Sequence, residues 1–375
     1  MVQFSLFHLM PYPYLERMPG NWPVPHKLFE PERASVDYQR YLDQMALGDE
    51  LGFDWVGCNE HHYSPYGLMS NPTLIGAALS QRTRRSRIAM LGALLPLNNP
   101  VRVAEEYAML DMMSGGRLIA GFIRGIPNEY IAYGVDPSTS WERFEEAYDL
   151  VLRAWTEPES FGWEGKHYQF RTVSIWPRPL QRPHPPILMS GGSLESAAFA
   201  ARKRAMMGVV QLSSQEFARE LYDTYRATAR EMGWEPPRSN LLVGLHTWVA
   251  RTDAEARKTL GESEEYFYSV LSRPSNHANE LVVSGTRYYQ SDAARNRRLE
   301  RRAKVMDLTI EDRIEQGTVL CGSPDTVVRQ IQQVVKALDI GTIQVNFKVG
   351  AVPNDAVEES MRLFSQEVLP HVRDL

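Results

Sequence analysis

The sequence predicts a closed barrel of eight parallel strands surrounded by helices, a (β/α)8 TIM barrel with insertions on its C-terminal face. Short apolar runs alternate with longer amphipathic stretches along most of the 375 residues. Several of these runs are apolar at nearly every position, which is typical of parallel strands covered on both faces. Eight runs have the length and composition of strands, and they occupy residues 4–9, 53–58, 88–95, 118–123, 186–190, 208–212, 241–250 and 342–349. Eight strands with helices between them favour the barrel.

Capping signals indicate where helices begin between these strands. Asn99 and Pro100 open one helix, because Asn can accept hydrogen bonds from the free amides and Pro tolerates the first helical position. Thr252 and Glu255 have the spacing of a capping box, and Ser323 stands where a third helix would begin. The predicted alternation of strands and helices therefore has local support at the helix starts.

An open, doubly wound sheet is the main competing architecture. No predicted strand is followed by the GxGxxG turn of dinucleotide-binding sheets, and no change in composition divides the chain into two domains. We therefore expect one domain over residues 1–375. A barrel core takes about 250 residues, and the additional residues should form insertions at about 11–32, 157–185 and 272–316. Long insertions of this kind usually lie on the catalytic face.

The composition limits the class of function. The chain has 41 Lys and Arg residues against 46 Asp and Glu residues, a net charge of −5, so it lacks the basic excess of a nucleic-acid-binding protein. Its two cysteines, Cys58 and Cys321, lie far apart and fit neither a disulfide framework nor a zinc site. Residues 1–18 lack the pattern of a signal peptide, and no apolar run approaches the ~20 residues of a membrane span. We expect a soluble, cytoplasmic protein that binds neither nucleic acid nor membranes.

The densest polar cluster directly follows the second predicted strand and has the sequence Asn59-Glu60-His61-His62-Tyr63. In a barrel, the residue that follows a strand points into the mouth of the active site. A histidine there can transfer protons near neutral pH. The cluster could instead be an ordinary loop whose polar residues satisfy one another. A metal site is a weaker possibility, since no HxH or HExxH spacing is present.

A second candidate site combines a glycine-rich turn with an arginine. Gly191, Gly192, Ser193 and Ser196 lie between the fifth predicted strand and a helix, where free amides and the helix dipole favour an anion. Arg124 directly follows the fourth predicted strand, and its guanidinium has a fork of donors suited to phosphate. Together they predict a two-sided phosphate clamp. Alternatively, the turn is a plain helix cap and the arginine pairs with one of Glu129, Glu142, Glu145 or Glu146.

Two further features lie inside the predicted barrel and its last insertion. Gly92 follows Leu91 within the third predicted strand, and a glycine at such a place often indicates close approach by a ligand or a kinked backbone. A local basic run consists of Arg295, Arg297, Arg298, Arg301, Arg302 and Lys304. The simpler interpretation of this run is a solvated helix face, and the alternative is a lid that attracts anions.

Four stretches, taken together, resemble the bacterial luciferase-like flavin-dependent monooxygenase family. They occur in the family's order and spacing, and they are Asn59-Glu60-His61-His62-Tyr63, Asn99-Pro100-Val101-Arg102-Val103-Ala104-Glu105-Glu106, Leu110-Asp111-Met112-Met113-Ser114-Gly115-Gly116-Arg117-Leu118 and Gly121-Phe122-Ile123-Arg124-Gly125. The resemblance is close from residue 4 to about residue 214 and looser beyond. It implies a TIM barrel that receives reduced FMN (FMNH2) in trans from an NAD(P)H-dependent flavin reductase, reacts it with O2 and oxygenates a small organic substrate. It also implies a homodimer formed through barrel helices.

The resemblance further implies roles for individual residues. His61 corresponds to a histidine beside the reacting edge of the flavin, and Arg124, Ser193 and Ser196 correspond to residues that hold the FMN phosphate. The position of Leu91 and Gly92 commonly carries a non-prolyl cis peptide beneath the flavin ring. We therefore predict that His61 and Glu60 are catalytic, and that the FMN-binding residues are Asn59, Leu91, Gly92, Arg124, Gly191, Gly192, Ser193 and Ser196.

Three alternatives to this function remain at the level of sequence. The first is a deazaflavin-dependent oxidoreductase that transfers a hydride and does not use O2. The second is a non-catalytic flavin-binding protein. The third is a metal-dependent barrel hydrolase that would use His8, Glu60, His61 and His62. Because the insertion at 11–32 is long, we do not expect a simple aldehyde as the substrate.

Overall fold

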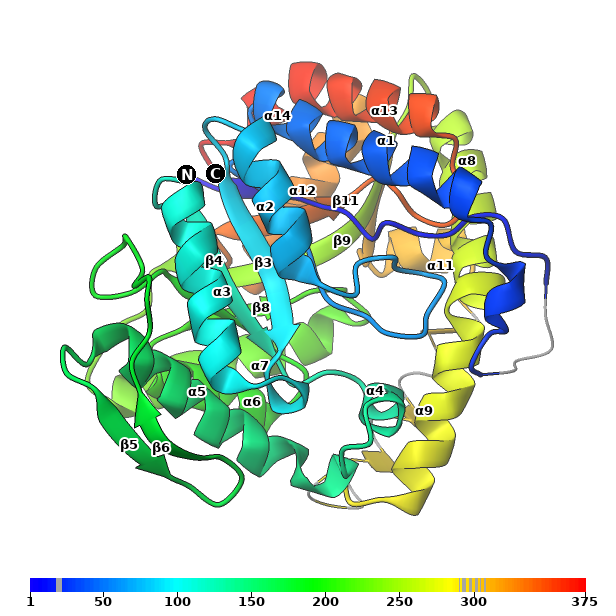
Figure 1. Cartoon of the computed structure of the whole chain (residues 1–375). Coiled ribbons are helices and arrows are strands. Elements are labelled where there is room, and N and C mark those ends of the chain that lie inside the picture. The colour runs from blue at the N-terminus through cyan, green and yellow to red at the C-terminus, as the bar shows by residue number, and fades with distance from the viewer. Residues whose placement is uncertain are drawn as a thin grey trace.

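The structure is a computed structural model that describes residues 1–17, 22–289, 291, 295–296, 299–300, 303, 305–306 and 308–375. Its centre is a barrel of eight parallel strands: β1 (Gln3–Phe7), β2 (Trp55–Cys58), β3 (Arg87–Leu94), β4 (Leu118–Ile123), β7 (Ile187–Ser190), β8 (Met206–Val209), β9 (Leu241–Val249) and β11 (Thr342–Asn346). Each strand pairs with the next in this order, and β11 pairs with β1. Figure 1 shows strands of this sheet, among them β3, β4, β8, β9 and β11, at the centre of the fold. The sheet closes on itself, so the predicted (β/α)8 barrel is confirmed.

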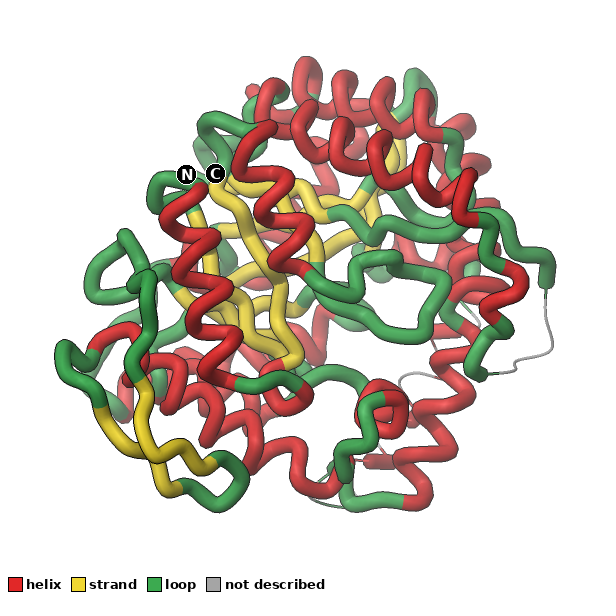
Figure 2. The backbone as a smooth tube through the Cα atoms, viewed as in Figure 1, coloured by secondary structure: helices red, strands yellow, loops and turns green. Residues whose placement is uncertain are grey.

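Helices surround the barrel (Figure 2). They are α1 (Pro31–Glu50), α2 (Pro72–Arg82), α3 (Pro100–Met113), α4 (Pro127–Ala132), α5 (Ser140–Thr156), α6 (Leu194–Arg202), α7 (Gln215–Glu231), α8 (Asp253–Tyr266), α9 (Arg273–Gly285), α11 (Ile310–Glu315), α12 (Pro324–Leu338), α13 (Asn354–Glu367) and α14 (Leu369–Val372). A π-helix, η5 (Phe267–Leu271), lies between α8 and α9. Among the described residues, none of the helices has the length and apolar character of a membrane span.

The packing explains why the strand prediction succeeded. All nine residues of β9 and all five residues of β11 are buried, as expected for strands covered on both faces. The helix starts also agree with their capping signals. The Asn99 side chain accepts hydrogen bonds from the amides of Val101 and Arg102, and Thr252 and Glu255 form the predicted capping box. Burial on both faces thus supports the predicted strands, and the caps support the predicted helix starts.

Elements within and beside the insertions were not predicted. The insertion at 157–185 contains an antiparallel hairpin, β5 (Phe161–Glu164) and β6 (Gln169–Val173). A ninth parallel strand, β10 (Val319–Gly322), pairs with residues 246–249 of β9. This strand was not among the eight predicted runs. Of the basic run, Arg295 belongs to the described residues, whereas Arg297, Arg298, Arg301, Arg302 and Lys304 lie outside them.

Candidate active site

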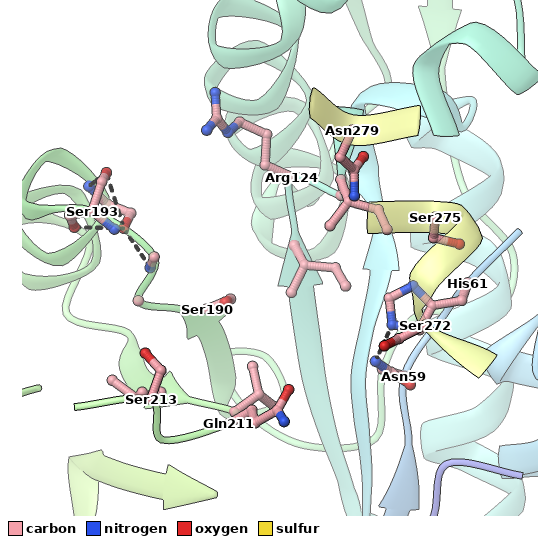
Figure 3. Close-up of a pocket in the computed structure, with 18 of the residues that line it drawn as sticks. Asn59, His61, Arg124, Ser190, Ser193, Gln211, Ser213, Ser272, Ser275 and Asn279 are labelled. Carbon is pink, nitrogen blue, oxygen red and sulfur yellow. Dashed lines mark hydrogen bonds between the residues drawn. The ribbon is translucent and has the colours of Figure 1, made fainter. Parts of the chain in front are cut away.

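A cavity of about 410 Å³ lies at the carboxyl ends of the barrel strands (Figure 3). Every barrel strand contributes to its wall: Phe7, Ser190, Val209 and Asn346 lie at strand ends, Asn59 and Arg124 directly after them, and Leu91 and His246 within their strands. The volume is in the range of small-molecule sites, and this end of a TIM barrel is the catalytic one. The cavity is therefore the candidate active site.

His61 lines the cavity and has partners on both ring nitrogens. Its Nδ1 lies 3.0 Å from an oxygen of Glu129, and its Nε2 lies 2.7 Å from the side-chain nitrogen of Asn59 (Figure 3). Glu129 is fully buried on α4 and also accepts hydrogen bonds from the amides of Ile126 and His62. A carboxylate at Nδ1 favours the tautomer with its proton there. Nε2 is then the nitrogen through which His61 can exchange a proton.

Glu60 and His62 lie on the other side of the same loop. The Glu60 carboxylate is 2.8 Å from Nε2 of His62 and accepts a hydrogen bond of 2.8 Å from the amide of Leu94. The Tyr133 hydroxyl lies 2.9 Å from Nδ1 of His62. These bonds tie the loop after β2 to the end of β3, and neither Glu60 nor His62 lines the cavity. The catalytic role expected for Glu60 therefore stays a prediction, and in this structure its carboxylate bonds the loop after β2 and the end of β3.

The alternative of a metal site has no geometric support. His8 hydrogen-bonds Gln44 at 2.9 Å instead of joining the histidines after β2. Burial lowers the pKa of His8 to about 3, which keeps this imidazole neutral. Among the residues that the structure describes, no three His, Cys, Asp or Glu side chains gather as metal ligands would.

The peptide bond between Leu91 and Gly92 is cis, as the family resemblance implies. Leu91 lines the cavity, whereas Gly92 faces the neighbouring strand β4. A Cβ atom at Gly92 would lie 2.0 Å from the carbonyl oxygen of Gly121, so no other residue fits without displacing the backbone. The Tyr107 hydroxyl bridges this irregular pairing, because it accepts from the amide of Ala93 and donates to the carbonyl of Gly121. Gly92 thus shapes the cavity wall without contributing to its lining.

Arg124 is half-buried in the cavity wall, and its hydrogen-bond partners there are neutral. Its Nη1 donates to the carbonyl of Tyr288 at 3.1 Å and to the hydroxyl of Ser140 at 3.3 Å. Its guanidinium lies 4.0 Å from the centre of the Tyr288 ring. No Asp or Glu of the described chain is within ion-pair distance of Arg124, and the candidate partners Glu129, Glu142 and Glu146 bond other groups. The alternative of a structural ion pair is therefore wrong.

The turn before α6 is a helix cap that also lines the cavity. The Ser193 hydroxyl caps the helix by accepting from the amide of Ser196, at 3.3 Å. The Ser196 hydroxyl accepts from the amides of Gly192 and Ser193. Gly191, Gly192, Ser193 and Ser196 all line the cavity, and the Arg124 side chain extends toward their side of it (Figure 3). The Ser196 hydroxyl also donates to the carbonyl of Ser193 at 2.7 Å, so an anion at this turn would replace these internal bonds and would also meet the guanidinium of Arg124.

Polar residues on the opposite wall were missed at the level of sequence. His246 on β9 and both Gln344 and Asn346 on β11 interrupt otherwise apolar strands and line the cavity. That interruption was the available signal. Within the described chain, several buried lining atoms lack a hydrogen-bond partner: Asn59 Oδ1, Ser272 Oγ, Asn279 Nδ2, Gln344 Oε1 and Asn346 Oδ1. Each such atom costs about 1–3 kcal/mol unless something bonds it, so water or a polar ligand in the cavity has to supply these bonds.

Comparisons with known sequences agree with this geometry. The family model for luciferase-like monooxygenases matches residues 18–339. A Sinorhizobium fredii protein of uncharacterized function is 36% identical over 200 residues, which cover 52% of this chain and 58% of that protein. The alkanal monooxygenase alpha chain of Photorhabdus luminescens is 23% identical over 92% of this chain and 94% of its own length. The oxygenase component of the flavin-dependent trigonelline monooxygenase of Acinetobacter baylyi is 25% identical over 61% of this chain and 64% of its own length.

Solved structures share the whole architecture. The monooxygenase RslO1 from Streptomyces bottropensis superposes with a TM-score of 0.77 at 29% identity and covers 98% of this chain and 99% of its own. The oxygenating constituent of 3,6-diketocamphane monooxygenase from Pseudomonas putida, in complex with FMN, has a TM-score of 0.76 at 20% identity, with 99% of each chain covered. An F420-dependent secondary alcohol dehydrogenase shares the fold with a TM-score of 0.70 at 18% identity, over 100% of this chain and 99% of its own. With the family model matched over most of its length, the chain belongs to the luciferase-like monooxygenase family.

Proposed function

We propose that this chain is the oxygenase of a two-component system, which takes reduced FMN in trans from an NAD(P)H-dependent flavin reductase and uses O2 to oxygenate a small organic substrate. The observation that carries the proposal is the environment of Arg124. A half-buried guanidinium that has no acidic partner among the described residues faces the same cavity as the hydroxyls of Ser193 and Ser196. This arrangement suits a dianionic phosphate, because charge-assisted hydrogen bonds to phosphate are the strongest that an arginine makes.

The rest of the cavity fits a flavin ring. Leu91 offers an apolar surface beside the cis peptide, and aromatic side chains of Phe122, Trp141 and Phe199 line the wall near Arg124. The unpartnered oxygen of Asn59 offers an acceptor for a ring N–H group. Reduced FMN, when bound, would supply two electrons to O2, so that one oxygen atom enters the substrate and the other leaves as water.

His61 would control a proton within this cavity. Glu129 holds the proton on Nδ1, and the contact from Asn59 to Nε2 can be exchanged for a contact to a bound ligand. His61 Nε2 would then donate or accept a proton where oxygen reacts. Apolar residues and the helices that cover the mouth would exclude water, which protects reactive intermediates from hydrolysis.

A ligand-binding experiment separates this proposal from a deazaflavin-dependent reductase. Anaerobic calorimetry should detect saturable binding of reduced FMN, and binding of reduced F420 should be at least about tenfold weaker. Oxygen should then be consumed by the FMN complex. Preferential binding of F420 without oxygen consumption would support the reductase, and binding of FMN without any oxygen chemistry would support a non-catalytic flavoprotein.

We also propose that the chain forms a homodimer through α2 and α3. Leu74 on α2 and Met109, Met112 and Met113 on α3 are 69%, 50%, 49% and 46% exposed, an unusual set of apolar side chains on two packed helices. A second copy would bury this surface. Sedimentation equilibrium should report a dimer for the unmodified chain and a monomer for Met109→Lys, and a monomeric unmodified chain would contradict the assignment.

A further inference from the structure

A second histidine lies across the barrel from the proposed flavin wall. His246 is on β9, and β9 is four strands away from β3 in either direction around the closed sheet. It lines the same cavity as His61 and Arg124. The residues proposed to bind flavin belong to β3 and to the segments after β2, β4 and β7, so the wall formed by β9 and β11 is available for the substrate.

His246 is held by a buried chain of charged groups. Its Nδ1 is hydrogen-bonded to the carboxylate of Glu264 on α8, and the other oxygen of that carboxylate lies 3.5 Å from Nε of Arg313 on α11. The three side chains are only 8%, 4% and 5% exposed. Arg313 is fixed further by a 2.6 Å hydrogen bond to the carbonyl of Val305 and by its position 4.4 Å from the centre of the Tyr268 ring.

This chain of charges orients the imidazole. Arg313 balances the charge of Glu264, so the pair is neutral as a unit, and the carboxylate still accepts the Nδ1 proton of His246. Nε2, which no described residue hydrogen-bonds, then has a lone pair that can accept a proton from a ligand in the cavity. If Nε2 becomes protonated, the adjacent carboxylate stabilises the resulting positive charge. The arrangement is that of an oriented general base.

The surroundings of His246 indicate what it would act on. The ring of Phe267 meets the imidazole edge-on at 5.4 Å, and the ring of Tyr268 also lines the cavity. Asn346 pairs with His246 in the register of β11 and β9, and Gln344 lies two residues earlier on the same face. Both amide side chains carry an unpartnered buried oxygen. Aromatic walls with neutral polar groups and a base suit an aromatic ring that carries a hydroxyl group.

We propose that His246 is a catalytic base that removes the proton from a ring hydroxyl of a phenolic substrate, with Glu264 and Arg313 as positioning residues. This inference rests on the proposed oxygenase function. The O–H bond breaks, its proton moves to Nε2, and its electron pair stays on the oxygen. The Nδ1 proton stays hydrogen-bonded to Glu264, and the summed charge of substrate and protein groups is unchanged. The phenolate oxygen raises the electron density of the ring carbons beside and opposite it, where an electrophilic oxygen atom adds.

The other ionisable groups near His246 leave this role to the imidazole. Burial raises the pKa of the Tyr268 hydroxyl, so Tyr268 stays a neutral hydrogen-bonding group. Its hydroxyl already accepts a 2.7 Å hydrogen bond from Gln211 and a 3.4 Å bond from Arg313. The strands on either side of His246 place Val319 and Asn346 in register with it, and neither residue titrates.

A fluorinated phenol tests the inference without requiring oxygenase turnover. The probe is 2-fluoro-4-nitrophenol, whose ionisation is followed by ¹⁹F NMR in the presence of the chain saturated with oxidised FMN. The bound probe should ionise about tenfold more readily than the free probe, which is a shift of about one pKa unit. His246→Asn should return the ionisation to within about twofold of the free probe. Glu264→Gln should lose most of the tenfold effect on ionisation but bind the probe with an affinity within a few-fold of the unmodified chain. Glu264→Asp, which keeps the carboxylate, should retain part of the effect on ionisation.

His61→Asn is the matched control, because it changes the other imidazole of the cavity. It should retain the full effect on the probe. The inference is overturned if the bound probe ionises like the free one, if His246→Asn keeps the effect, or if His61→Asn is the variant that loses it. Failure of the chain to bind FMN would contradict the proposed function instead. The probe titration repeated without FMN would still decide the role of His246.

Discussion

Replacing Arg124 by alanine should weaken FMN far more than riboflavin, because the two ligands differ only in the phosphate. In the structure, the guanidinium has hydrogen bonds to a neutral hydroxyl and a carbonyl but no acidic partner within the described residues. A phosphate would therefore gain a charge-assisted contact that no internal carboxylate opposes. Hydrogen bonds to charged groups contribute about 1.5–3 kcal/mol, which corresponds to about 10- to 150-fold in affinity. Because Arg124 is only half-buried, screening should place the effect toward the lower end.

Fluorescence quenching of oxidised FMN and riboflavin measures both affinities on the same protein. Riboflavin should lose less than about threefold in Arg124→Ala. Arg102→Ala is a suitable control, since Arg102 lies outside the cavity and pairs with Glu106 on the surface of α3. It should leave both affinities unchanged. Equal weakening of FMN and riboflavin in Arg124→Ala would refute the reasoning, because it would mean that the arginine only supports the cavity wall.

Further predictions concern the histidines and glycines of the site. His61→Ala should leave FMN affinity within a few-fold, lower product formation by about 10²–10⁴-fold and raise the hydrogen peroxide released per flavin oxidised. His62→Ala should reduce product formation less, because His62 does not line the cavity. An unchanged product-to-peroxide ratio in both variants would contradict the proposed role of His61. Gly92→Ala should lower the free energy of unfolding by about 1–3 kcal/mol or more, because the added Cβ would lie 2.0 Å from a backbone oxygen. A Cβ at Gly192 would meet no atom within 4 Å, so Gly192→Ala should leave the free energy of unfolding, measured in urea melts, nearly unchanged. Burial lowers the pKa of His8 to about 3 in the folded chain, so between about pH 6.5 and pH 3 the unfolded chain binds a proton at His8 that the folded chain does not. The free energy of unfolding should therefore fall by up to about 1.4 kcal/mol for each pH unit across this range. His8→Gln should flatten that slope, and an unchanged slope would exclude His8 as its source.

The barrel was predictable because its strands carry strong local signals. Strands buried on both faces are apolar at nearly every position, and the helices between them begin at recognisable caps such as Asn99. The residue after a strand of a barrel faces the active site, and this rule located His61 and Arg124. Where a rule depended only on position along a strand or a helix, the sequence was sufficient.

The rest of the site depends on contacts between distant segments. Glu60 and His61 are adjacent, but only His61 lines the cavity, and the sequence did not indicate that Glu129 would be the partner of His61. Likewise, Arg313 reaches Glu264 from another helix across an insertion without a regular period. His246 could have been noticed as a polar residue in an apolar strand, but its partners could not. Long-range pairing of this kind is determined by packing and not by local pattern.

The most direct test of the central claim follows oxygen in a single turnover. The chain saturated anaerobically with reduced FMN is mixed with O2, and oxygen consumption and hydrogen peroxide release are recorded together without substrate. If the cavity binds reduced FMN and keeps water out, oxygen should be consumed before peroxide appears, and His61→Ala should shorten that delay. Release of peroxide at the same rate as oxygen consumption, as with free reduced FMN, would contradict the claim that this chain is a flavin-dependent oxygenase.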